Sequence, residues 1–377
     1  MDGNGVSRRA ALCLLGTGLT LAAGCSSSEE TEGGGNGSTE TGAEGENLDG
    51  EGDPAIETGD LPAFTQALAA TPDENYFFGA VDLETMWTVF DGDGDRRFEG
   101  DEDESESGET PTDPLVVNPL SAALIGYVVL LGLGFSAAGS VYERNDRAGG
   151  EGYVVFANDT NIVVSDYDFD GIVADMGELD YEEVLLEDDR AVYYDASTGQ
   201  AVGATESLFV YAHESENGDE DEFDPIAAVE RHVDAAVGER PLEHETDDDF
   251  EWLLRAGDTT GLVFCLFSDA DELAADATDL DEDEFESTEG GDSGTDLDVD
   301  DQPYEGAKGG LQHLDIVTDE SRPFASAVFT YASEDRIDEE RLEDAVGTQA
   351  EAGSTTVVRD GARVRVEATY AEETLEE

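Results

Sequence analysis

The chain has 377 residues and carries 95 acidic side chains against 17 basic ones, a formal charge of −78 at pH 7. Such a polyanion repels phosphate groups, which argues against nucleic acid as a partner. Hydrophobic residues still make up 38% of the chain, more than a disordered acidic protein contains. We therefore expect a folded body with the acidic groups on its surface.

The balance of charged residues predicts adaptation to concentrated salt. Lys308 is the single lysine among the 17 basic residues. In dilute buffer so many like charges repel one another, whereas at molar salt the Debye length falls to about 3 Å and the repulsion is screened. The composition resembles that of proteins from extremely halophilic archaea. The alternative is an acidic secreted protein without this adaptation.

The first 25 residues have the layout of an export signal. Arg8 and Arg9 precede an uncharged stretch, residues 10–24, that ends in Leu-Ala-Ala-Gly before Cys25. This order resembles a twin-arginine signal peptide followed by a lipobox. The resemblance implies export in the folded state, removal of the signal, and a mature N-terminus at Cys25 that carries lipid on its sulfur.

Cysteine usage agrees with that interpretation. Cys13 would be removed with the signal and Cys25 would be lipidated, which leaves only Cys265 in the mature body. No internal disulfide could then form. Because Cys265 lies in the apolar run of residues 261–267, we expect a buried, inert thiol.

The composition changes several times along the chain and predicts its organisation. After the signal at 1–25, the Gly-, Ser- and Glu-rich stretch 26–60 is typical of a disordered tether. The rest divides into an α+β domain at 61–275, which contains an acidic insert at 91–113 and an apolar helix at 114–142, then an acidic low-complexity insert at 276–310 and a shorter α+β unit at 311–377.

Short apolar runs predict most of the strands. They are expected at residues 76–82, 153–157, 162–165, 184–186, 190–194, 207–212, 262–267 and 324–331, and in a hairpin that joins 357–358 to 364–366 across Asp360-Gly361. Asn158-Asp159 should turn an earlier hairpin between 153–157 and 162–165. The run 262–267 is apolar throughout, so it should be a central strand.

Helices are predicted by apolar residues at helical spacing. One begins near Phe169, with Asp168 or Asp170 as its cap, and another runs from the Asp224-Pro225 cap to Gly238. Two more are expected at 249–254 and 338–350. Because the order strand, helix, hairpin occurs twice, at 162–194 and 326–370, we predict two ferredoxin-like α/β sandwiches with antiparallel sheets. One larger α/β sandwich is the alternative.

Residues 114–142 carry no charged side chain. The stretch is long enough to cross a membrane, and Gly132, Ser136 and Ser140 place small residues at every fourth position, as in closely packed transmembrane helices. A span would, however, put the strands at 76–82 and 153–157 on opposite sides of the membrane. A buried core helix or helix pair is favoured, and the span is the alternative.

Two acidic segments are weak calcium candidates. They have the acid spacing of an EF-hand loop, and their residues are Asp91, Asp93, Asp95 and Glu102 in the first and Asp166, Asp168 and Asp170 in the second. Arg96 replaces the glycine of the first loop, and Gly177 replaces the last carboxylate of the second. We therefore expect solvated acidic loops and no metal or other cofactor.

No catalytic motif is found in the chain. His213, His232, His244 and His313 are scattered and lack a second ligand at metal spacing, and His232 is expected on a solvated helix face. No catalytic residue is predicted, so the chain is expected not to be an enzyme. Paired carboxylates are too abundant here to indicate a hydrolase.

The signal at Arg8 and Arg9 with Cys25, and the polar tether behind it, resemble the secreted lipoproteins of haloarchaea. The resemblance implies a lipid-anchored, non-enzymatic protein at the outer face of the cytoplasmic membrane, with a binding or structural role. Membrane lipid is the expected partner through Cys25, and no further protein or small-molecule partner is indicated. The alternatives are a carboxylate-based extracellular hydrolase and a calcium-dependent binding module.

Overall fold

The computed structural model describes residues 55–72, 75–90, 113–158, 160–214, 223–270, 273, 302–316, 323–338, 341–342, 345–347 and 352–370. The predicted export and lipidation residues Arg8, Arg9 and Cys25 lie outside these ranges. So do the residues of the first calcium candidate, Asp91, Asp93, Asp95 and Glu102.

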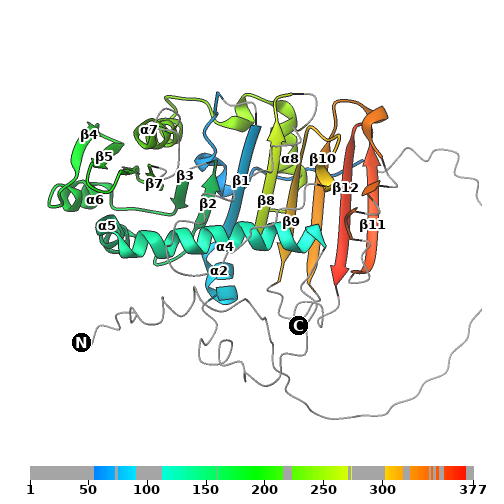
Figure 1. Ribbon diagram of the computed structural model, residues 1–377, viewed down its shortest axis with the longest axis horizontal. Helices are drawn as coiled ribbons and strands as arrows, with labels where there is room; N and C mark the ends of the chain where they lie inside the picture. The colour runs from blue at the N-terminus through cyan, green and yellow to red at the C-terminus, as the bar shows by residue number, and fades with distance from the viewer. Residues whose placement is uncertain are drawn as a thin grey trace, which may run out of the picture.

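Twelve strands form one sheet in the order β11-β12-β10-β9-β8-β1-β2-β3-β7-β6-β5-β4 (Figure 1). All neighbouring strands are antiparallel. Their bounds are β1 (Asn75–Asp82), β2 (Tyr153–Ala157), β3 (Thr160–Val164), β4 (Glu182–Leu186), β5 (Ala191–Asp195), β6 (Gln200–Ala204), β7 (Leu208–His213), β8 (Leu262–Ser268), β9 (Gly309–Asp315), β10 (Phe324–Thr330), β11 (Ala352–Asp360) and β12 (Arg363–Tyr370).

The predicted α+β class is confirmed, but the two separate ferredoxin-like sandwiches are not. The reason lies in β8, whose residues are all buried and which pairs with β1 on one side and with β9 on the other. A strand that is apolar on both faces is stable only between neighbours. β8 therefore joins the strands of both predicted units into one continuous sheet.

Helices cover both faces of this sheet. On one face lie α2 (Leu83–Phe90), α4 (Pro114–Phe135), α5 (Ala137–Asn145) and α6 (Phe169–Met176). On the other lie the 3-10 helix η1 (Ala63–Ala67), α7 (Pro225–Ala236) and α8 (Asp248–Ala256). α4 crosses β2, β1, β8, β9 and β10 in front of the sheet in Figure 1. The molecule thus has three layers, with a hydrophobic core on each side of the strands.

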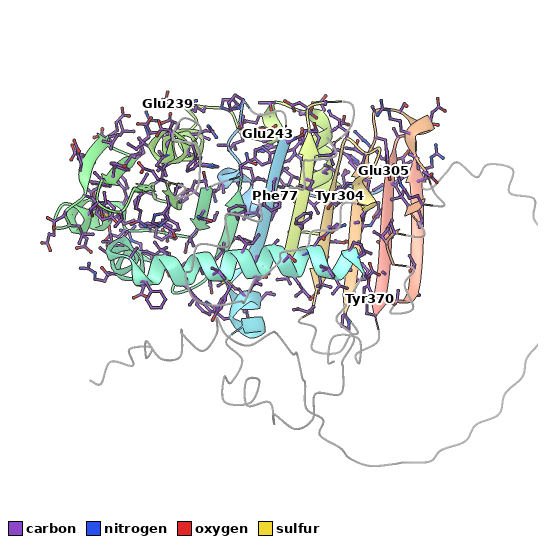
Figure 2. All side chains as sticks on the ribbon, in the orientation of Figure 1. Phe77, Glu239, Glu243, Tyr304, Glu305 and Tyr370 are labelled. Atoms are coloured by element: carbon purple, nitrogen blue, oxygen red, sulfur yellow. The ribbon has the colours of Figure 1, made fainter. Side chains whose placement is uncertain are left out.

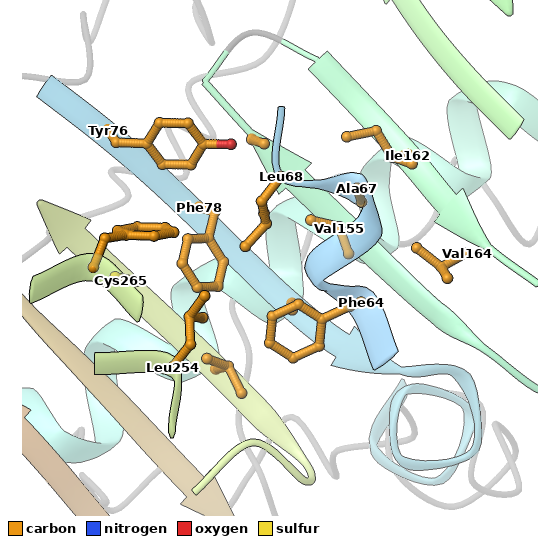
Figure 3. Packing of buried hydrophobic residues seen from close by; sticks show 14 of the residues in the cluster. Phe64, Ala67, Leu68, Tyr76, Phe78, Val155, Ile162, Val164, Leu254 and Cys265 are labelled. Atoms are coloured by element: carbon orange, nitrogen blue, oxygen red, sulfur yellow. The ribbon is translucent and has the colours of Figure 1, made fainter. Parts of the chain in front are cut away.

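The core on the η1 face is shown in Figure 3. Phe64 and Leu68, from η1 and the residue after it, pack against Phe78 of β1 and Val155 of β2. Cys265 of β8 lies in the same cluster and is completely buried, and burial raises the pKa of its thiol well above the usual value. The predicted burial of this thiol is confirmed.

α7 begins and ends as the sequence predicts. The Asp224 carboxylate accepts hydrogen bonds from the amides of Ile226 and Ala227 at 3.0 and 3.1 Å, and Gly238 follows the helix at φ +80°. The predicted solvated position of His232 is wrong. This side chain is 3% exposed, and its Nδ1 lies 2.7 Å from the carbonyl oxygen of Ala67. His232 is buried because η1, which the sequence did not predict, packs on α7.

β6 is a strand that the sequence analysis missed. Its residues, Gln-Ala-Val-Gly-Ala, are small and are flanked by a turn at Gly199, so they lack the β-branched run that marks a strand. At Gly203 an added Cβ would lie 2.5 Å from Cγ1 of Val229. The small residues of β6 therefore let α7 approach the sheet closely.

Two predicted domain boundaries shift. The predicted tether, 26–60, ends too late, since Ile56 is buried in the core and the Gly59 amide donates to the Arg255 carbonyl at 2.7 Å. The predicted acidic insert, 276–310, also ends too late, because Tyr304 is buried and Gly309 and Gly310 begin β9. Both segments contain apolar or small residues that the sheet and its helices require.

Candidate functional site

The second calcium candidate has structural roles. The Asp168 carboxylate caps α6 by accepting from the Gly171 amide at 3.3 Å and pairs with Arg147 at 2.9 Å, and the Asp166 carbonyl accepts from the Arg147 amide at 2.7 Å. Asp170 lies in the first turn of α6. Within the described ranges, no group of three or more His, Cys, Asp or Glu side chains could hold a metal ion.

α4 starts at a buried carboxylate. Asp113, the residue before the helix, accepts from the Leu115 amide at 3.0 Å, which caps the helix. The same carboxylate accepts from the Gly347 amide at 3.1 Å and from the Tyr370 hydroxyl at 2.9 Å. Figure 2 shows Tyr370 beside the start of α4. Asp113 thus ties the beginning of α4 to the last strand of the sheet.

The inner face of α4 fits closely on the strands because small residues meet there. A Cβ added at Gly79 of β1 would lie 2.7 Å from Cβ of Ala122. One added at Gly126 would lie 3.3 Å from Cγ1 of Val154 in β2. This half of the helix is buried, as the core-helix interpretation predicts.

The other half of α4 faces outward and is apolar. We define the outer face of α4 by seven uncharged residues that fall on one side of the helix at helical spacing and are exposed or partly exposed: Val117, Leu120, Ser121, Leu124, Val128, Leu131 and Phe135. Leu120, at the margin of this face, also packs against the core. Val128 is 46% exposed and Phe135 65%. Trp87 of α2, which contacts α4, is 43% exposed.

This outer face is the unusual surface of the molecule. A helix that is apolar all round is normally buried or crosses a membrane, and α4 is covered on one side only. Among the described helices, α4 is the one long and apolar enough to cross a membrane by length and composition. The sequence indicated the uncharged segment but not which of its residues remain exposed.

A buried acid, Glu243, is a second place where chemistry could occur. Burial, together with the nearby charges of Asp269 and Asp247, raises the pKa of its carboxyl to about 7. Its Oε2 accepts from the Thr71 amide at 3.3 Å, and its own amide donates to the Leu68 carbonyl at 2.8 Å. No spacing in the sequence distinguishes Glu243 from the other acids.

His232 lies close to the same segment, and burial lowers the pKa of its imidazole to about 4. His232 is hydrogen-bonded to the Ala67 carbonyl, and Glu243 is hydrogen-bonded to Leu68 and Thr71. Both residues therefore hold the segment that follows η1 in position. These contacts give the two residues a structural role. Figure 2 shows Glu243 near the upper ends of the strands and Tyr370 near their lower ends.

Ser326, Asp258 and His313 form a third polar group, on the α8 face of the sheet. Ser326 of β10 lies opposite His313 of β9, and its hydroxyl donates to Asp258 at 3.0 Å. Arg365 donates to the same carboxylate at 2.8 Å. Neither ring nitrogen of His313 has a hydrogen-bond partner in the described part of the chain. Among the described residues, the Ser326 hydroxyl is therefore bonded to a carboxylate that also pairs with Arg365, and it makes no bond to His313.

Lys308, the single lysine, is held in an ion-pair network. Its Nζ lies 2.8 Å from Asp247 and 3.2 Å from Asp249, and 5.0 Å from the centre of the Phe267 ring. Burial alone would lower the pKa of Lys308, but the bonds and charges of the two aspartates outweigh it and raise the pKa. A lysine held in its charged form is not a nucleophile.

Comparison with known proteins assigns no family. No protein-family model and no curated protein matches the chain. Among solved structures, crystal form III of TP0453 matches with 10% identity and a TM-score of 0.35, over 84% of this chain and 97% of that one. Crystal form I of TP0453 matches with 8% identity and a TM-score of 0.33, over 84% and 96%. A likeness at this level carries no argument about fold or function.

Proposed function

We propose that the chain is a lipid-anchored, non-enzymatic envelope protein of a halophile, held at the outer face of the cytoplasmic membrane and serving a binding or structural role. The observation that supports it best is the outer face of α4, an apolar and uncharged surface on a chain with a charge of −78. Exposed apolar patches of this kind mark interaction surfaces. The expected export signal at Arg8 and Arg9 and the expected lipidation site at Cys25 would place that surface outside the cell.

The polar groups of the described residues support the same proposal. Glu243, His232 and Lys308 hold neighbouring segments together, and Ser326 bonds to Asp258. A carboxylate hydrolase remains the second candidate, because a carboxyl with a pKa of about 7 is suited to general acid catalysis. Activity that Glu243→Gln abolishes without unfolding the protein would favour the hydrolase.

The anchor and the export route are tested by cell fractionation. Cys25→Ser should move the protein from the membrane fraction to the medium, and Arg8→Lys with Arg9→Lys should leave a precursor inside the cell. Cys13→Ser is the matched control, since Cys13 lies within the signal and should not change the distribution. Unchanged fractionation of the Cys25 and double-arginine variants would contradict both parts of the proposal.

A further inference from the structure

The outer face of α4 needs an explanation because the fold does not require it. The core needs only the inner face, where Ala122 and Gly126 meet the strands. Surface positions in this chain are rich in acid, yet α4 has no Asp or Glu among its 22 residues. An apolar outer face is unfavourable in water. Something other than water should therefore cover it.

A second copy of the chain fits this surface poorly. A helix of 22 residues is about 33 Å long and about 10 Å wide, so its outer stripe covers on the order of 300 Å². A stable protein interface buries about 800 Å² on each partner. The small area therefore disfavours a dimer through α4.

A protein partner would also find few polar groups to bind. Protein interfaces contain about one hydrogen bond per 100–200 Å², whereas Ser121 is the single side chain with a hydroxyl or other polar group among the seven residues of the outer face. The backbone groups in the middle of the helix are already bonded within it. Acyl or isoprenoid chains need no hydrogen bonds, so a lipid surface suits the outer face better.

We propose that the outer face of α4, together with Trp87, lies on the lipid surface of the cell membrane. The inference rests on the proposed function, because the lipid on Cys25 would keep the body at that membrane. One lipid chain gives only weak attachment, and stable anchoring takes a second signal. The outer face of α4 supplies this signal, and exposed Trp87 has the amphipathic side chain that favours the membrane interface.

α4 lies along the membrane and does not cross it. To cross, it would have to leave the sheet, which would expose the strand residues under its inner face, among them Phe77 and Phe264. It would also have to break the bonds of the buried Asp113 carboxylate to Gly347 and Tyr370. Binding at the surface keeps these contacts and covers the outer face, so the sheet lies parallel to the membrane.

The test uses the Cys25→Ser chain, purified in molar NaCl, so that the anchor does not contribute. We expect it to float with phosphatidylcholine vesicles, and equally with vesicles that include phosphatidylglycerol, because molar salt screens the acidic surface. Val128→Gln with Phe135→Gln should weaken vesicle binding about tenfold, as the loss of two apolar contacts implies. Val184→Gln with Leu186→Gln is the matched control, since these side chains are 40% and 43% exposed on β4.

Trp87 supplies a second measurement that does not depend on substitution in α4. The chain has two tryptophans, and the other, Trp252, is buried beneath Arg363. In a Trp252→Phe background the emission of Trp87 should shift to the blue on addition of vesicles and be quenched by brominated lipid. Emission unchanged by vesicles would overturn the placement of α2 and α4 on lipid.

Several outcomes would overturn the inference. Absence of flotation, or equal flotation of the α4 variant, would show that lipid does not cover this face. Resistance of the bound protein to alkaline carbonate would indicate a span. A dimer in sedimentation that the α4 variant dissociates would identify a second copy as the occupant. If Cys25→Ser floats with vesicles and also stays in the membrane fraction of cells, the proposed anchor fails and this inference stands. If Cys25→Ser moves to the medium and does not float, this inference alone fails.

Discussion

The buried carboxylate of Asp113 accepts a hydrogen bond of 2.9 Å from the hydroxyl of Tyr370, 257 positions later in the chain. Asp113 begins α4 and Tyr370 ends β12, so one bond joins the helix to the edge region of the sheet. The start of α4 is therefore fixed in position by a contact with a strand that is distant in sequence.

Tyr370→Phe should lower the free energy of unfolding by about 2 kcal/mol, because it leaves the buried side chain of Asp113 without one of its hydrogen bonds. Urea denaturation in molar NaCl measures the change. Tyr194→Phe is the control, since its hydroxyl bonds Glu214 at the exposed surface and its loss should cost less than about 0.5 kcal/mol. Equal costs for both variants would contradict a special role for the Asp113 contact.

Gly79→Ala should destabilise the protein by about 1–3 kcal/mol, because the new Cβ would lie 2.7 Å from Cβ of Ala122 and α4 would have to move away from β1. Gly134→Ala is the matched control in α4. A Cβ there meets nothing within 4 Å, and alanine favours the helix by about 1 kcal/mol. Thermal unfolding should therefore shift in opposite directions for the two variants, and a shift in the same direction would show that α4 does not pack as described.

Glu243 and His232 should give opposite pH dependence of stability. Because burial raises the pKa of Glu243 to about 7, the stability that its neutral form provides is present below about pH 4.5 and is lost as the pH rises through about 7. The pKa of His232 is lowered to about 4, so stability is lost as the pH falls from about 6.5 through about 4. Each shift corresponds to about 3 kcal/mol, and the two effects largely cancel between about pH 4.5 and 6.5.

Single variants separate these two effects. Relative to the unmodified chain, Glu243→Gln should become more stable as the pH rises from 4.5 to 7, and His232→Gln should become more stable as the pH falls from 6.5 to 4. Urea denaturation at several pH values in molar NaCl measures both differences. Curves parallel to that of the unmodified chain would show that neither group titrates differently on folding.

The acidic surface predicts salt-dependent folding. The protein should be folded in about 2 M KCl or NaCl and should lose tertiary structure when dialysed to about 0.1 M, where the Debye length increases to about 10 Å and the carboxylates repel one another. Near-UV circular dichroism follows the aromatic side chains of the core. A spectrum that is unchanged at low salt would contradict the halophilic interpretation.

Local features of the fold could be predicted because they depend on residues close in sequence. The Asp224 cap and Gly238 bound α7, the Asp168 cap begins α6, and Asn158, at φ +47°, turns the hairpin of β2 and β3. Each requires only a side chain that bonds the nearest amides or a residue that tolerates positive φ. The uncharged stretch that forms α4 could also be predicted, because the absence of charge is a local property of the sequence.

The tertiary structure decided what depends on partners distant in the chain. The pairing of β8 with β9 makes one sheet where the sequence predicted two, and η1 buries His232 against the Ala67 carbonyl. For α4, the sequence determined that every position lacks charge. The close contact of Gly79 with Ala122 decides which half of the helix meets the strands, since only small residues let helix and sheet approach so closely. The other half, with Val128 and Phe135, stays uncovered.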